Sequence, residues 1–292
     1  MTRRARLLHL WLRWIERSAL GRLRDQDVVR VRRRFEWQGR ILFPIPRGIA
    51  RRWITRAGMT VLELGPSEGA QILYLHGGGY VFGSPRTHKG LAGRLVARTG
   101  LGAVVPDYPL APEHPFPAAP EAVLALYRDM AARGPVVLAG DSAGGGLALA
   151  LLAMICAEPD LPGPRATLVL SPLTDLAMTG DSLARNDATE ALLPVDGIRA
   201  SALGYLDGAA PEDPRASPLH ARFPGAGPVH VWVGDGEVLL DDSRRMVAAL
   251  EAQGITAHLT VEPGLPHVWP IFPGWLLPEA ERTLDQMAAA IR

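Results

Sequence analysis

Residues 136–146 read Val136-Val137-Leu138-Ala139-Gly140-Asp141-Ser142-Ala143-Gly144-Gly145-Gly146. The apolar, β-branched start of this stretch predicts a strand, and the Ala- and Leu-rich residues after it predict a helix. Glycines two positions before and two after Ser142 permit a strained turn from strand to helix, which would lift the serine hydroxyl above a sheet. We interpret the stretch as a nucleophile elbow; an ordinary helix-start turn is the alternative on this motif alone.

A second glycine-rich motif precedes the elbow. The apolar strand predicted over Gln71–Leu75 leads into His76-Gly77-Gly78-Gly79-Tyr80. Three consecutive glycines cost chain entropy, so they indicate close approach of the backbone to a ligand; a flexible turn is the alternative. The backbone N–H groups of Gly77, Gly78 and Ala143 are candidates to converge on a carbonyl oxygen as it becomes negative. The motif therefore predicts the oxyanion hole of an acyl-transfer enzyme.

Length and composition favour one catalytic domain with insertions. The chain has 292 residues, of which 48% are hydrophobic, enough to bury a full core. Strands and helices alternate from about Trp53 to the C-terminus, which predicts a mostly parallel sheet flanked by helices. Residues 177–224 interrupt this alternation with turn residues and short helical patterns. We expect them to form a cap insertion within a catalytic domain of residues 51–292.

Charge is distributed unevenly along the chain. The net charge of +1 gives no overall argument for a nucleic-acid partner, but residues 1–60 hold sixteen arginines and four acidic residues. We expect residues 1–50 to form a helical cap segment, with a second basic helix over Val28–Phe35. The first helix has a predicted apolar face of Leu7, Leu8, Trp11, Leu12, Ile15 and Leu20. We interpret that face as a lid on the catalytic domain; contact with an anionic membrane surface is the alternative.

Nothing in the sequence indicates export. Cys156 is the only cysteine, so no intrachain disulfide can form. The apolar run Leu7–Leu12 is short, is interrupted by His9 and is followed by no small-residue cleavage site. No stretch approaches the length that a membrane-spanning helix needs. We therefore expect a cytoplasmic protein.

The order of a serine, an acidic cluster and a histidine along the chain indicates a class of enzyme. Ser142 is followed by an acidic cluster, Asp235–Asp242, after a later strand, and by His267 after the next one. Serine, acid and histidine follow one another in this order in α/β-hydrolases. With these motifs, the chain resembles the hormone-sensitive-lipase-like family of bacterial esterases. The matching segments are His76–Tyr80, Asp107–Pro117, Gly140–Gly145, Ser171–Leu176, Ser217–Leu219, Glu237–Asp242 and Pro266–Trp269.

The catalytic acid needs a separate argument because the acidic cluster offers several carboxylates. Alignment with the family pattern places Glu237 where most members have Asp, so Glu237 is our candidate. Glutamate can also accept the imidazole Nδ1–H and stabilise the imidazolium. Asp235 is the alternative acid. We interpret Asp241 and Asp242 as caps of a helix over Ser243–Gln253.

The resemblance implies a mechanism. His267 would take the Ser142 proton as the hydroxyl attacks an ester carbonyl, an acyl-enzyme would form, and water would release the acid. No metal or organic cofactor is required. The resemblance also implies a supporting role for His76 and Gly79 in the oxyanion loop, short-chain acyl esters as substrates, and a homodimer formed through the edge of the last strand.

Two other functions remain open at this point. A deacetylase or amidase acting on an acetylated small metabolite would use the same triad, and its selectivity would lie in contacts that the sequence does not specify. A non-catalytic small-ligand receptor is the alternative from another class, although such proteins often lack a triad member. All three candidate members are present here.

Overall fold

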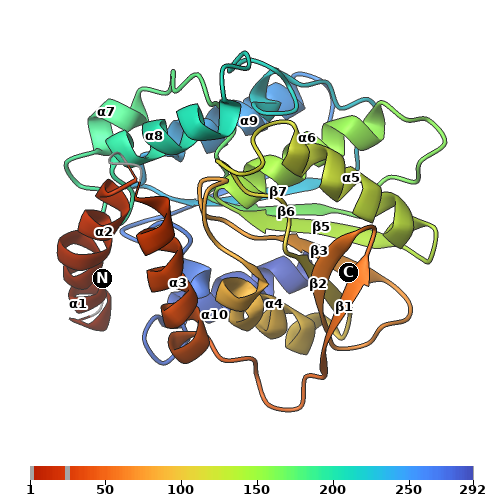
Figure 1. The fold of residues 1–292 in the computed structure, drawn as a ribbon, viewed down its shortest axis with the longest axis horizontal. Helices are drawn as coiled ribbons and strands as arrows, with labels where there is room; N and C mark the ends of the chain where they lie inside the picture. Colours follow the sequence, from red (N-terminus) through yellow and green to blue (C-terminus); the bar gives the residue numbers. More distant parts are fainter. Residues whose placement is uncertain (1–2, 24–26, 292) are drawn as a thin grey trace.

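A single mixed sheet forms the centre of the molecule (Figure 1). The computed structural model describes residues 3–23 and 27–291, and within these the sheet has eight strands in the order β1-β2-β4-β3-β5-β6-β7-β8. The strands are β1 (Arg51–Arg56), β2 (Met59–Leu64), β3 (Gln71–Leu75), β4 (Gly102–Pro106), β5 (Val136–Asp141), β6 (Thr167–Leu170), β7 (Val229–Gly234) and β8 (Ala257–Glu262). β2 pairs antiparallel with β1 and β4, and every other neighbouring pair is parallel.

Helices cover both faces of the sheet. In Figure 1, α5, α6 and α9 lie above the sheet, and α4 and α10 lie below it. Their bounds are α4 (Pro85–Thr99), α5 (Ala118–Ala131), α6 (Ala143–Cys156), α9 (Leu240–Glu251) and α10 (Pro278–Ala289). Each face has its own apolar core, and strands β3 and β4 are buried along their whole length, as expected for parallel strands packed on both sides. The predicted mostly parallel sheet flanked by helices is confirmed.

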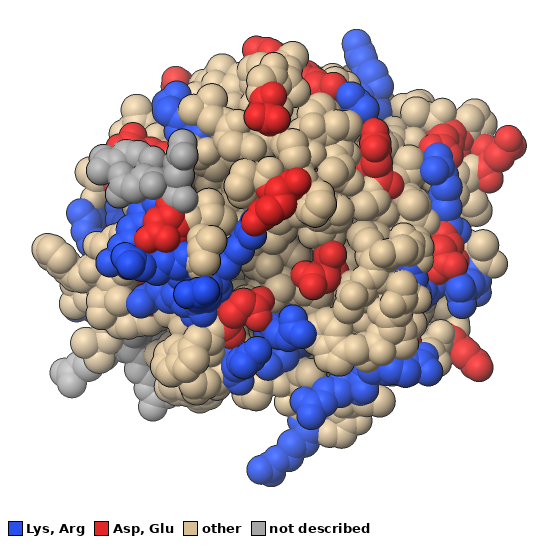
Figure 2. Space-filling view, in the orientation of Figure 1, with Lys and Arg blue, Asp and Glu red and all other residues tan. Residues whose placement is uncertain are grey.

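The N-terminal segment lies beside residues 177–224 (Figure 1). Its helices are α1 (Arg3–Trp11), the π-helical turn η1 (Leu12–Glu16), α2 (Arg17–Gly21) and α3 (Val28–Leu42), and the other region contains α7 (Ser182–Asn186), α8 (Val195–Leu206) and the 3₁₀ turn η2 (Pro218–His220). Arg17 joins the two: its guanidinium donates to the carbonyl oxygen of Leu193 at 2.6 Å and to Asp187 Oδ1 at 2.5 Å. Figure 2 shows Lys and Arg side chains gathered at the left of the molecule, where α3 lies in Figure 1.

The N-terminal helices differ from the sequence prediction in two ways. The second basic helix continues past Phe35 to Leu42, because Gln38 and Gly39 give it a further buried turn. The apolar face of the first helix is only half buried. Leu8 and Leu12 are in the core, whereas Leu7 and Ile15 are 67% and 46% exposed.

The prediction that Asp241 and Asp242 cap a helix is wrong. Helix α9 begins at Leu240, so both residues lie in its first turn. Their carboxylates bond elsewhere: Asp242 Oδ2 accepts the backbone N–H of Thr174 at 2.7 Å, and Asp241 Oδ2 accepts that of Ser182 at 2.8 Å. These two aspartates therefore attach residues 174–182 to α9.

Within the described parts of the chain, none of the helices has both the length and the apolar character that a membrane crossing needs. Cys156 is half-buried at the end of α6, and its burial raises the pKa of the thiol.

Candidate active site

Ser142 lies in a strained turn between β5 and α6. Its φ of 53° falls in the left-handed region, which is unfavourable for a residue with a side chain. Neighbouring glycines make the turn sterically feasible. A Cβ at Gly140 would lie 2.4 Å from the carbonyl oxygen of Gly144, and a Cβ at Gly144 would lie 2.2 Å from that of Leu75. The spacing of glycines around Ser142 thus follows from the close approach of β3, β5 and α6.

The His76–Tyr80 loop touches this elbow. A Cβ at Gly77 would lie 2.2 Å from Asp141 Oδ2, and the φ values of Gly78 and Gly79 are 127° and 59°. Only glycine adopts such backbone angles without strain. Gly77, Gly78 and Gly79 line the same cavity as Ser142, and Ala143 is fully buried at the first position of α6.

His76 braces the loop from inside the protein. It is fully buried, its ring stacks on Tyr108 with centroids 4.2 Å apart, and its Nδ1 lies 3.0 Å from the carbonyl oxygen of Gly77. Because a carbonyl only accepts, Nδ1 carries the proton. Burial and the neighbouring His88 lower the pKa of His76 to about 3, so the ring is neutral at physiological pH. The Tyr108 hydroxyl donates to the His76 carbonyl oxygen at 2.6 Å.

Asp141 ties the elbow to two other elements. The Tyr74 hydroxyl of β3 donates to Asp141 Oδ1 at 2.7 Å, and His88 Nε2 of α4 lies 3.2 Å from Oδ2. Burial would raise the pKa of Asp141, but the charge and hydrogen bond of His88 and the hydrogen bond from Tyr74 outweigh burial and lower it. Asp141 is therefore ionised, and its bonds to Tyr74 and His88 fix the backbone directly before Ser142.

Glu237 and His267 form a buried pair. Glu237 Oε2 lies 2.6 Å from His267 Nδ1, and both residues are at most 3% exposed. Glu237 Oε1 accepts the Ser171 hydroxyl at 2.8 Å and the Gly234 N–H at 2.6 Å, so hydrogen bonds hold both oxygens of the carboxylate in place. Burial alone would lower the pKa of His267, but the charge and hydrogen bond of Glu237 raise it.

The other candidate acid points elsewhere. Asp235 is exposed, and its Oδ1 accepts the Gly264 N–H at 2.7 Å. His267 and Ser142 line one cavity, although no hydrogen bond joins them in the described structure. Nucleophile and base are often held loosely when no substrate is bound. The geometry favours Glu237 over Asp235 as the partner of the histidine.

Comparison with known proteins gives the family. The family model for the alpha/beta hydrolase fold matches residues 72–271. The chain belongs to the α/β-hydrolase family. An esterase of Acinetobacter venetianus is 36% identical over 254 residues, covering 85% of this chain and 83% of its own. An acetyl-hydrolase of Streptomyces hygroscopicus is 38% identical over 229 residues, covering 77% and 76%.

A crystal structure gives the subgroup of this α/β-hydrolase. An esterase of the bacterial hormone-sensitive lipase family superposes with a TM-score of 0.85 at 33% identity, covering 94% of this chain and 96% of the other. The resemblance inferred from the motifs is confirmed. This α/β-hydrolase is a carboxylic ester hydrolase of the hormone-sensitive-lipase-like group.

A second buried carboxylate lies behind the Glu237–His267 pair of this hydrolase. Glu190 is 2% exposed, and its two oxygens accept the backbone N–H groups of Leu192 at 2.9 Å and Val238 at 3.1 Å. Burial and the charge of Glu237 raise the pKa of Glu190, and the charge of Glu190 in turn helps to raise that of His267. Glu190 belongs to no sequence motif, so its place in the site could not be predicted from the sequence.

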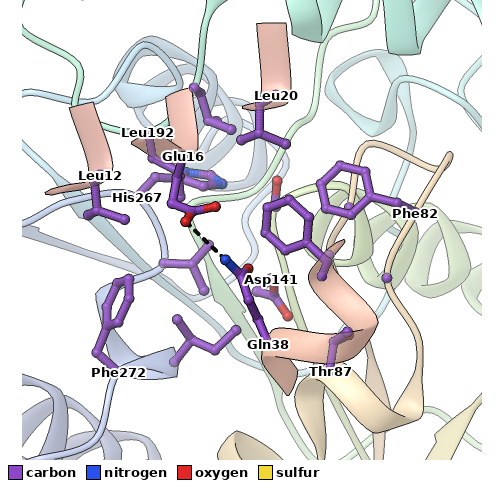
Figure 3. Close-up of a pocket in the computed structure, with 18 of the residues that line it drawn as sticks. Leu12, Glu16, Leu20, Gln38, Phe82, Thr87, Asp141, Leu192, His267 and Phe272 are labelled. Carbon is purple, nitrogen blue, oxygen red and sulfur yellow. Dashed lines mark hydrogen bonds between the residues drawn. The ribbon is translucent and has the colours of Figure 1, made fainter. Parts of the chain in front are cut away.

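The cavity of the hydrolase has a volume of about 440 Å³ and mostly apolar walls. Figure 3 shows side chains from the N-terminal helices, among them Leu12 and Leu20, facing the same space as His267 and Asp141. One polar pair stands among them: Gln38 Nε2 donates to Glu16 Oε1 at 2.9 Å (Figure 3). Glu16 is 2% exposed and also pairs with Arg34 at 2.6 Å. This pair joins η1 to α3 inside the cavity wall, and no pattern in the sequence predicts it.

Proposed function

We propose that this carboxylesterase hydrolyses short-chain acyl esters through an acyl-enzyme on Ser142. The observation that carries the proposal is the 2.6 Å contact of Glu237 with His267 in the wall of the cavity that contains Ser142. A carboxylate that accepts from Nδ1 leaves Nε2 free to act as a base. The strained elbow and the adjacent glycine loop supply the two other requirements, an accessible nucleophile and N–H donors.

In the proposed reaction, Ser142 Oγ attacks the carbonyl carbon of the ester while His267 Nε2 takes the hydroxyl proton. The carbonyl oxygen becomes negative and accepts hydrogen bonds from the N–H groups of Gly77, Gly78 and Ala143. The C–O bond to the alcohol then breaks, and His267 returns its proton to the leaving oxygen. Water repeats the sequence on the acyl-enzyme and releases the carboxylic acid.

Two segments of the chain that line the cavity support a cap role in this proposal. Residues 1–50 supply Leu12, Leu20 and Gln38 to the wall, and residues 177–224 supply Leu192 and Ile198. We assign both segments to a cap on the catalytic domain of residues 51–292. The preference for a short acyl group rests on the relative named acetyl-hydrolase, and the apolar cap walls would receive the remainder of the ester.

The test is hydrolysis of p-nitrophenyl esters from acetate to laurate by the wild type and by Ser142→Ala. We expect the highest kcat/KM on the shortest acyl chains and a loss of about 10⁶-fold in kcat in the variant. p-Nitroacetanilide, the amide of the same acyl and aryl groups as the acetate ester, tests the amidase alternative. Faster turnover of the amide than of the ester would move the assignment to an amidase, and ester turnover that survives in Ser142→Ala would contradict the proposed nucleophile.

Location and assembly belong to the same proposal. A cytoplasmic location is supported by the single, half-buried cysteine. A homodimer would form along β8, the outer strand of the sheet beyond β7, because an edge strand presents unpaired N–H and C=O groups. Light scattering tests the dimer, which would have twice the chain mass of 31.4 kDa.

Peripheral contact of the basic N-terminal segment with an anionic membrane is supported by its arginines.

A further inference from the structure

The first helix of the chain carries two apolar rows. One row, Leu8 and Leu12, is buried in the protein. The other row, Leu7, Leu10 and Trp14, recurs every three or four residues and is 67%, 53% and 73% exposed. A helix that packed only on its own protein would need apolar side chains only on the buried side, that of Leu8 and Leu12. The second row therefore indicates an apolar partner outside the chain.

Helix α3 and a C-terminal loop expose further large apolar side chains. Trp37 and Ile41 lie one turn apart on α3 and are 64% and 58% exposed. Trp275, in the loop before α10, is 71% exposed. We call Leu7, Leu10, Trp14, Trp37, Ile41, Leu42 and Trp275 the apolar surface.

Three members of the apolar surface also line the ester cavity. Leu7 of α1, Leu42 of α3 and Trp275 each have an exposed side chain and contribute to the cavity wall. The mouth of the cavity therefore opens among α1, the end of α3 and the loop that holds Trp275. An apolar ester entering there would pass directly from the apolar surface to the apolar wall of the cavity.

Arginines flank the apolar surface. Arg6 and Arg13 lie on α1 and η1, and Arg33 and Arg40 lie on α3 within one turn of Trp37. All four are exposed, and in the described part of the chain none of them forms an ion pair, unlike Arg17, Arg32 and Arg34. Figure 2 shows the positive charge that gathers near α3. Exposed tryptophan and leucine beside exposed arginine is the composition of surfaces that bind anionic lipid.

We propose that the apolar surface docks on an anionic lipid bilayer, so that the mouth of the ester cavity faces the lipid. Arginines would contact the lipid phosphates, and the tryptophans would enter the headgroup region. A second copy of this chain fits the surface less well, because a symmetric contact would bring the same arginines together. The inference rests on the proposed function and deepens it: the substrate is a short-chain acyl ester of a lipid-soluble alcohol, taken from the bilayer.

Co-sedimentation of the full chain with vesicles tests the docking. One set of vesicles is phosphatidylcholine alone, and the other contains equal parts of phosphatidylcholine and phosphatidylglycerol. We expect about tenfold tighter binding to the anionic vesicles. We expect the variant Leu10→Gln/Trp14→Gln/Trp37→Gln to bind them about tenfold more weakly than the wild type. None of these three residues lines the cavity, so the variant should hydrolyse water-soluble p-nitrophenyl butyrate at the wild-type rate.

Two controls accompany the triple variant. Leu203→Gln removes a side chain with the same 67% exposure as Leu7 from α8, outside the apolar surface, and should leave vesicle binding unchanged. Arg13→Gln/Arg33→Gln/Arg40→Gln keeps every apolar side chain and should abolish the preference for anionic vesicles. This charge variant carries the test if the triple apolar variant is unstable.

Hydrolysis of oleyl acetate embedded in the anionic vesicles reports the consequence for the reaction. We expect Leu10→Gln/Trp14→Gln/Trp37→Gln to hydrolyse oleyl acetate about tenfold more slowly than the wild type and p-nitrophenyl butyrate at the wild-type rate. A wild type that hydrolyses p-nitrophenyl butyrate but does not bind anionic vesicles would overturn the docking and leave the proposed function standing. Equal binding by the wild type and both triple variants would also overturn it. Absence of Ser142-dependent hydrolysis of p-nitrophenyl butyrate would instead contradict the proposed function itself.

Discussion

The carboxylate of Glu190 accepts the backbone N–H of Val238 at 3.1 Å, next to the residue that pairs with the histidine. Glu190 comes from residues 177–224, and its own carbonyl oxygen accepts a hydrogen bond from Arg17 of α2 at 3.2 Å. The loop that holds Glu237 is therefore fixed by the same residues that bind the N-terminal helices. Two carboxylates, Glu190 and Glu237, act on the pKa of His267 in the same direction.

Glu190→Gln should shift the pH dependence of kcat/KM. His267 must be neutral to act as a base, so activity is lost as pH falls through its pKa, which the charges of Glu237 and Glu190 raise. The amide keeps one acceptor oxygen for the N–H groups of Leu192 and Val238, and it removes the negative charge. We expect the acid limb to move to lower pH, measured with p-nitrophenyl butyrate. Glu251→Gln, on the exposed end of α9, should leave the limb in place; an unmoved limb in Glu190→Gln would refute the coupling.

Glu237→Gln should lower kcat by about 10⁴-fold, because the amide cannot stabilise the imidazolium and favours the wrong tautomer of His267. Asp235→Asn is the matched control. Its side chain is exposed and accepts the Gly264 N–H, so we expect kcat within about threefold of the wild type. Steady-state kinetics of both variants decide the assignment. A larger loss in Asp235→Asn than in Glu237→Gln would transfer the role to Asp235.

Ser171→Ala should lower kcat by about tenfold. The Ser171 hydroxyl donates to Glu237 Oε1 at 2.8 Å, and the loss of one hydrogen bond to a buried charge costs about 1.5–3 kcal/mol. Ser243→Ala removes another buried hydroxyl, which donates to the carbonyl oxygen of Leu239, the residue before α9. It should lower stability without changing kcat. Equal kcat in Ser171→Ala and the wild type would show that Ser171 does not position Glu237.

Gly144→Ala should prevent folding or lower the free energy of unfolding by about 3 kcal/mol or more, because its Cβ would lie 2.2 Å and 2.3 Å from two carbonyl oxygens. Gly204→Ala is the opposite case. Gly204 is inside α8, and a Cβ there would meet no atom within 4 Å, so we expect a gain of about 0.5–1 kcal/mol. Urea denaturation measures both. A folded Gly144→Ala of wild-type stability would contradict the packing at the elbow.

The sequence was sufficient for the parts of the site that depend on local backbone geometry. Gly140 and Gly144 are required by contacts with backbone oxygens, and such requirements leave a fixed spacing around Ser142. The order of Ser142, Glu237 and His267 follows from their places after β5, β7 and β8. The glycine spacing could be predicted because it lies in one short stretch of chain, and the order of the three residues because each lies just after a recognisable strand.

Side chains that act through tertiary contacts left no such pattern. Glu190 reaches Val238 from a separate region, and Glu16 is buried only because Arg34 and Gln38 lie across from it on another helix. In the sequence, Glu190 and Glu16 are single acidic residues that belong to no recognisable motif. The same limit explains α1: a helical apolar face predicted burial, but whether Leu7 faces the protein or solvent depends on how the whole helix packs.

The most direct test of the account is covalent labelling of the wild type with diethyl p-nitrophenyl phosphate, followed by mass spectrometry of its peptides. The reagent phosphorylates an activated serine and releases p-nitrophenol. We predict one diethylphosphoryl group per chain, located on Ser142, with complete loss of ester hydrolysis and slower labelling in Glu237→Gln. Labelling at another residue, or ester hydrolysis that persists after Ser142 is fully labelled, would contradict the assignment of Ser142 as the nucleophile.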